Sequence, residues 1–209
     1  MRFFKAAIAL MLVMLMLTSC TLGLDKLEYD NDANTYTDTK TGISYTDAPT
    51  RYEAVSVGEK YAKWRNSATT VIFHSMEGAD PAEWLTESGK VLFYADGVTL
   101  PEPDEMDINK ILVCVDGEHI MTLASIENAE HIDSIIDTWQ NAEAVEYPAL
   151  TPTINYRIKM VSPTYPWMYY NLIYIEYSDG GCYLYSRDDG RCVEAGDLIR
   201  GYLDGTIEG

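Results

Sequence analysis

The clearest hydrophobic periodicity lies in the second half of the chain. Four apolar residues recur at positions i, i+3, i+4 and i+7: Ile132, Ile135, Ile136 and Trp139. This spacing places them on one face of an α-helix. Asn128 precedes the run, where a residue that caps a helix belongs. The pattern therefore predicts a helix that begins after Asn128 and buries this face.

Alternating patterns predict strands on both sides of this helix. Apolar residues at 154, 156, 158 and 160 alternate with polar ones, which is typical of a sheet with one solvated face. The segments 111–115 and 120–123 flank Asp116 and Gly117, a strong hairpin signal. Further elements are expected as strands at 169–177, 182–185 and 191–194, and as a helix at 197–203.

The first half predicts a hairpin, then strand, helix and strand. The hairpin turns at 40–42, and the strands cover 69–75 and 91–94. Asp80 can cap a helix, Pro81 suits its first position, and Glu83 completes a capping box. Gly89 is the expected helix end. Hairpins and sheets with about three helices together predict an antiparallel α+β fold.

The N-terminus has the layout of an export signal. Arg2 and Lys5 precede an apolar run of 12 residues, 6–17, which ends in Leu17-Thr18-Ser19-Cys20. A membrane-spanning helix needs about 20 apolar residues, so a permanent transmembrane anchor is the weaker alternative. The last four residues resemble the lipobox of bacterial lipoproteins. The whole chain resembles, more loosely, uncharacterised envelope lipoproteins of Gram-positive bacteria.

The lipoprotein resemblance implies a location. Residues 1–19 would be a removed signal peptide, and Cys20 would carry the lipid on the extracytoplasmic face of the cell membrane. Residues 20–34 are polar and acidic, and predict a flexible tether. Residues 35–209 are expected to form a single domain. The loop 100–107, with two prolines and four acids, leaves a subdivision open.

Charge narrows the range of partners. The chain has a formal net charge of −18, and loss of Arg2 and Lys5 leaves 13 basic and 33 acidic residues, which gives −20. Nucleic acids bind basic clusters, so nucleic acid is excluded as a partner. Anionic lipid would also repel this chain, and the acyl group must therefore hold it to the membrane.

No residue cluster predicts a cofactor, a metal or a catalytic centre. Asp30, Asp32 and Asn34 have the spacing of a calcium loop, but Thr35 and Thr41 replace the required Gly and Glu. The three histidines His74, His119 and His131 lack zinc-ligand spacing. No nucleophile motif occurs. A carboxylate pair for glycoside hydrolysis needs no motif, so an envelope hydrolase stays open as an alternative.

Three cysteines remain after lipidation: Cys114, Cys182 and Cys192. An odd number cannot pair fully within one chain. Cys182 and Cys192 are also too far apart across the hairpin expected to turn at 188–190, so all three are interpreted as buried thiols. A disulfide from Cys114 stays open.

Tyrosine supplies the candidate binding site. Seven tyrosines and Trp167 lie between positions 165 and 185. A two-residue turn at Asp179 and Gly180 would pair residues whose numbers sum to 359. One face would then carry the candidate ligand-binding residues: Tyr170, Tyr174, Tyr183, Tyr185 and Glu176. Such a face suits a sugar or an extended peptide, although tyrosines also favour strands for packing alone.

These observations predict a lipid-anchored, non-enzymatic module that binds a glycan, peptide or protein of the cell envelope. The alternatives are the hydrolase and a structural component of an envelope complex.

Overall fold

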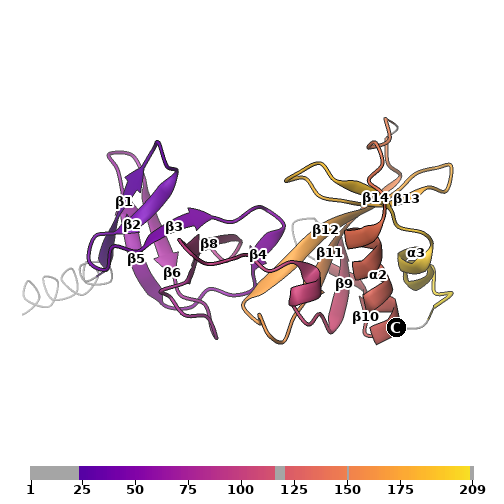
Figure 1. Cartoon of the computed structure of the whole chain (residues 1–209), viewed down its shortest axis with the longest axis horizontal. Helices are drawn as coiled ribbons and strands as arrows, with labels where there is room; N and C mark the ends of the chain where they lie inside the picture. The colour runs from indigo at the N-terminus through magenta and orange to yellow at the C-terminus, as the bar shows by residue number, and fades with distance from the viewer. Residues whose placement is uncertain (1–23, 116–120, 150, 208–209) are drawn as a thin grey trace, which may run out of the picture.

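The computed structural model describes residues 24–115, 121–149 and 151–207. Strands hold 41% of the described residues and helices 12%. Fourteen strands form one continuous sheet, which Figure 1 shows as two lobes. The predicted α+β class with three helices is therefore wrong, because the described chain is mainly β with two α-helices and one 3-10 turn.

The first lobe is a closed barrel of seven strands. Going round it, each strand pairs with the next, and β1 pairs with β5 in parallel to close the ring. Leu27, Tyr45, Phe73, Leu85 and Phe93 fill its interior and are at most 3% exposed. In order, the strands are β1 (Asp25–Asp30), β2 (Thr35–Asp38), β3 (Ser44–Asp47), β8 (Val91–Ala95), β7 (Trp84–Glu87), β6 (Thr70–His74) and β5 (Lys60–Arg65).

Strand β7 replaces the helix predicted after Asp80. The start signals are real, since the backbone N–H groups of Glu83 and Trp84 both donate to the Asp80 carbonyl. They produce a single turn. Trp84, Leu85 and Thr86 are buried in succession, and burial on both faces is typical of an interior strand. The barrel outweighs the local helix signal because β7 pairs with both β6 and β8.

Part of the predicted tether is also folded. Residues 25–30 form β1, and Leu27 is fully buried in the barrel. Composition favoured a flexible linker because this segment is acidic. Burial of Leu27, ring contacts of Tyr29 with Tyr36 and Trp64, and pairing to β2 and β5 order it.

The second lobe is an open sheet with helices on one face (Figure 1). Its long path runs β10–β9–β11–β12–β4, and β13 and β14 extend from β12. Short β4 joins the lobes, because it pairs with β12 and also with β8. The elements are β4 (Tyr52–Ala54), η1 (Pro103–Glu105), β9 (Lys110–Val115), β10 (Met121–Ile126), α2 (Ala129–Asn141), β11 (Ile154–Val161), β12 (Met168–Glu176), β13 (Cys182–Tyr185), β14 (Cys192–Glu194) and α3 (Leu198–Leu203).

The periodic predictions in this lobe are confirmed. The Asn128 side chain accepts the N–H of His131 at the start of α2, and Ile132, Ile135 and Trp139 are buried. Strands β9 and β10 pair as predicted, although their turn at Asp116 and Gly117 lies outside the described residues. The core beneath α2 extends into the first lobe, since Trp84 and Leu92 of the barrel strands join it, whereas the barrel interior forms a cluster of its own.

The polar face of β11 is less solvated than its alternation predicts. Lys159 is 5% exposed and Glu53 7%. Both carboxylate oxygens of Glu53 lie about 3 Å from the Lys159 Nζ, and Arg157 and Asn171 also donate to Glu53. The charges tolerate burial because they are paired and hydrogen-bonded.

The cysteine prediction holds for the described residues, where Cys114, Cys182 and Cys192 are buried and free.

Candidate functional site

The predicted tyrosine face does not form, because the β12–β13 pairing differs from the prediction by one residue. Tyr174 faces Leu184, and Ile173 faces Tyr185, so paired numbers sum to 358. The N–H of Tyr177 donates to the carbonyl of Gly181, which leaves three residues in the loop. Gly180 has a φ of +93°, as three-residue hairpin loops with a bulge require. A slip of one residue turns every side chain to the opposite face.

The five candidate residues therefore separate. Tyr170 and Tyr174 lie on the face beneath the helices and are at most 1% exposed. Tyr183 and Tyr185 are half-buried on the other face, where Tyr185 contacts the ring of Tyr147. Glu176 accepts a 2.7 Å hydrogen bond from the Tyr174 hydroxyl. Tyr170 and Tyr174 therefore cannot share a ligand with Tyr183 and Tyr185, because the two pairs lie on opposite faces of the sheet. Of the five residues, Tyr170 alone lines the main cavity.

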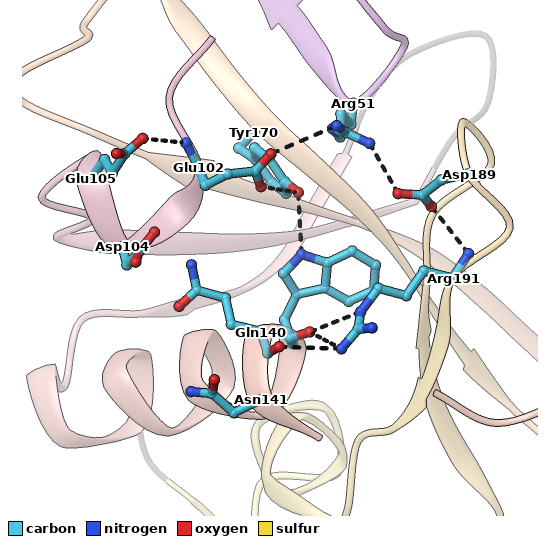
Figure 2. A pocket seen from close by; sticks show the side chains of 10 residues that line it. Arg51, Glu102, Asp104, Glu105, Gln140, Asn141, Tyr170, Asp189 and Arg191 are labelled. Atoms are coloured by element: carbon cyan, nitrogen blue, oxygen red, sulfur yellow. Dashed lines mark hydrogen bonds and ion pairs between the residues drawn. The ribbon is translucent and has the colours of Figure 1, made fainter. Parts of the chain in front are cut away.

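That cavity has a volume of about 460 Å³, within the usual range of ligand pockets. It lies where the segments that connect the lobes meet the end of α2 and the β13–β14 turn (Figure 2). We call it the junction pocket. It is lined by Arg51, Glu102, Asp104, Glu105, Trp139, Gln140, Asn141, Tyr170, Asp189 and Arg191.

Arg51 sits between two carboxylates on opposite walls. Its guanidinium lies 3.1 Å from Asp189 and 3.6 Å from Glu102. The neighbouring Asp188 fixes this arrangement, because its carboxylate accepts the backbone N–H groups of Thr50 and Arg51. Residues 138 positions apart in the chain are thereby held together.

A chain of hydrogen bonds runs from the helix to Glu102. The Trp139 indole N–H donates to the Tyr170 hydroxyl at 3.1 Å, and that hydroxyl donates to Glu102 at 3.2 Å. Burial, reinforced by the nearby Glu102 charge, raises the pKa of Tyr170 above its ordinary value. Tyr170 therefore stays a neutral donor and orients the carboxylate that faces the pocket.

Arg191 is directed at the end of α2 rather than at the cavity. Its guanidinium donates to the carbonyls of Trp139, Gln140 and Ala142 at 2.9–3.3 Å and lies 5.4 Å above the Trp139 ring. The last carbonyls of a helix lack intrahelical partners and carry partial negative charge. Arg191 thus stabilises the helix end and places Gln140 and Asn141 at the pocket.

Asp189 remains ionised at neutral pH. Burial alone would raise the pKa of its carboxyl, but the hydrogen bond from the Arg191 backbone N–H and the charge of Arg51 lower it below the ordinary value. Asp189 and Glu102 are about half exposed, so both offer oxygen atoms to the pocket. Asp104 and Glu105 add further exposed carboxylates.

Metal-binding geometry is not found among residues 24–115, 121–149 and 151–207, which contain no cluster of three His, Cys, Asp or Glu side chains suited to an ion. Asp30, the first residue of the spacing that resembles a calcium loop, instead accepts hydrogen bonds from the backbone N–H groups of Asp32 and Ala33 in a turn. His131 bonds the Tyr202 hydroxyl at 2.7 Å, and His119 lies outside the described residues.

Sequence reasoning missed the junction pocket. It identified 100–107 as an acidic loop, 188–190 as a turn and Trp139 as a core residue, each by itself. No sequence signal pairs Arg51 with Asp189.

Neither a protein-family model, nor a curated protein, nor a solved structure matches the chain. In the part of the chain that the structure describes, no helix has the length and apolarity needed to cross a membrane.

Proposed function

We propose that the chain is a lipid-anchored extracytoplasmic module that binds a polar envelope ligand in the junction pocket. The observation that carries this proposal is that most hydrogen-bond donors around the cavity are already paired with other groups of the protein. The Arg51 guanidinium is paired with two carboxylates, Arg191 with three carbonyls, and the Trp139 and Tyr170 donors with their neighbours. The Asn141 amide donates to Asp137.

Arg51 Nε has no partner but is buried, and the Gln140 amide lines the pocket; the other groups left for a ligand are mainly acceptors. Carboxylate oxygens of Asp104, Glu102 and Asp189 face the cavity (Figure 2), and ionised carboxylates only accept hydrogen bonds. The expected ligand carries several hydroxyl or amine donors, as envelope glycans and the ends of peptides do. Bonds to a charged acceptor are about twice as strong as neutral ones.

The geometry favours binding over hydrolysis. Acid-catalysed glycoside cleavage needs one carboxyl whose pKa is raised. Asp189 has a lowered pKa, and Arg51 lies against both Asp189 and Glu102 as a permanent counter-charge. Asp189 is thereby held in its ionised form, which suits recognition of a ligand rather than donation of a proton.

The pocket is tested by thermal unfolding of residues 21–209 with peptidoglycan fragments, envelope glycans, short peptides and calcium. We expect one ligand class to raise the midpoint. Asp104→Ala should weaken binding of that ligand at least tenfold, since a hydrogen bond to a charged group contributes about 1.5–3 kcal/mol. Asp133→Ala, an exposed carboxylate on α2 outside the pocket, is the matched control. Equal affinity in the two variants would place the ligand elsewhere.

The anchor is tested separately. The lipobox residues 17–20 lie outside the described residues, so this part of the proposal rests on the sequence. Cys20→Ala should release the protein from the membrane fraction, because no second acyl site is expected and the chain is strongly acidic. Retention of Cys20→Ala in the membrane would contradict lipid attachment.

A further inference from the structure

Strand β10 forms a free edge of the sheet. Within the described residues its backbone pairs on one side, with β9, and helix α3 packs close to it. The barrel strands have no comparable edge because the ring is closed, and the outer side of β14 is contacted by the Val145 N–H, which donates to the Cys192 carbonyl. Met121 and Leu123 on β10 are 57% and 42% exposed.

This edge lacks the charged residues and prolines that usually protect edge strands. Its six residues, Met-Thr-Leu-Ala-Ser-Ile, contain neither, although the chain as a whole has a net charge of −18. The next residue, Glu127, is paired with Lys110 at 2.7 Å. Two copies of a strongly acidic protein can therefore approach here without placing like charges opposite one another.

The strand is also complementary to itself. In an antiparallel pair centred between Leu123 and Ala124, Met121 faces Ile126 of the second copy, and Thr122 faces Ser125. Hydroxyls meet hydroxyls, and Leu123 meets Ala124, whereas Ile126 is already buried in the core of its own copy. The irregularity between Thr122 and Ala124 preserves this match, because it places Met121 and Ile126 on one face of the sheet and Thr122 and Ser125 on the other.

We propose that β10 pairs with β10 of a second copy across a twofold axis, which joins the two open sheets into one. Self-complementary patches are what twofold dimers require. Six residues bury less surface than the roughly 1,200 Å² of stable interfaces, so the dimer is weak in solution. If the lipid anchor of the proposed function is correct, confinement to one membrane raises the effective concentration and favours the pair.

Sedimentation equilibrium of residues 21–209, at protein concentrations up to about 1 mM and in high salt to screen charge, measures the association. The weight-average mass should rise toward twice the monomer value. Leu123→Lys should weaken association at least tenfold, because it places two charges at the axis. Val57→Lys is the matched control, an exposed valine of the first lobe (46%). A monomer at every concentration, or equal loss in both variants, would overturn the proposal.

Disulfide trapping tests the register. In the proposed pair the two copies of residue 123 lie about 6 Å apart, within disulfide reach, and those of residue 121 about 17 Å apart. Leu123→Cys should cross-link on mild oxidation, and Met121→Cys should not, although Met121 is the more exposed. Cross-linking of Met121→Cys alone, or of both equally, would contradict this register.

Discussion

The two lobes differ in whether their sheet is closed: the first lobe is a closed barrel, and the second is an open sheet. The barrel pairs every strand on both sides and fills its interior with rings, such as Phe73 and Phe93 at 5.0 Å. The second lobe leaves its sheet open, tolerates buried charges at Glu53 and Lys159, and carries the junction pocket and the free edge. A closed sheet has little surface to offer, so sites for ligands or partners collect where the sheet opens.

Breaking the barrel core should have the largest effect. Phe73 is fully buried and packs against Tyr36 and Phe93. Phe73→Ala should lower the free energy of unfolding by about 3–5 kcal/mol, measured by urea denaturation. Val55→Ala, at an exposed position, should change it by less than about 0.5 kcal/mol. A small effect of Phe73→Ala would mean that the barrel interior is not closely packed.

The open sheet should be sensitive through its buried charges. Glu53→Gln leaves Lys159 without its carboxylate partner, and loss of one member of a buried pair costs about 3 kcal/mol. Glu77→Gln, at an exposed carboxylate, is the control and should be neutral in the same urea measurement. If Glu53→Gln were equally neutral, the charges would not be buried as described.

The tyrosines sharpen the comparison within the second lobe. Tyr174 is fully buried, and Tyr174→Ala should cost about 3–5 kcal/mol. Tyr185 is half-buried on the opposite face, and Tyr185→Ala should cost about 1 kcal/mol. Equal costs would favour the register that places both rings on one face.

The smallest expected effect is the pH dependence of Asp189. Its pKa is lower in the folded protein, so its stabilisation is present above the ordinary carboxyl pKa of about 4 and is lost as pH falls through the folded value. The side chain is 48% exposed, so Asp189→Asn should cost less than about 1 kcal/mol at pH 7. The difference between their free energies of unfolding, measured in urea, should shrink as pH falls below about 4. A difference that grows there would contradict the lowered pKa.

Sequence patterns predicted elements that are set by neighbouring residues. The spacing of Ile132, Ile135 and Trp139 identified α2, and Asn128 caps it as expected. The same patterns failed where pairing with distant strands decides the type of secondary structure. Trp84–Glu87 carries a helix start signal and becomes a strand because β6 and β8 lie beside it.

The candidate site failed for a related reason. The tyrosine face depended on one loop residue, because a three-residue loop at 178–180 reverses the faces that a two-residue loop would give. The junction pocket depends on contacts such as Arg51 with Asp189, which are 138 positions apart. Such contacts follow from the fold, and the periodicity of residues along the chain cannot predict them.

The central claim is that the junction pocket binds the ligand. The most direct measurement compares thermal unfolding of the wild type and Asp104→Ala with each ligand class. A ligand at about 100 times its dissociation constant adds about 2.7 kcal/mol, which raises the wild-type midpoint by roughly 5–10 °C in a chain of this size. We predict such a rise from one class and a clearly smaller rise in Asp104→Ala. A rise of equal size in both proteins, or no rise with any class, would contradict the account.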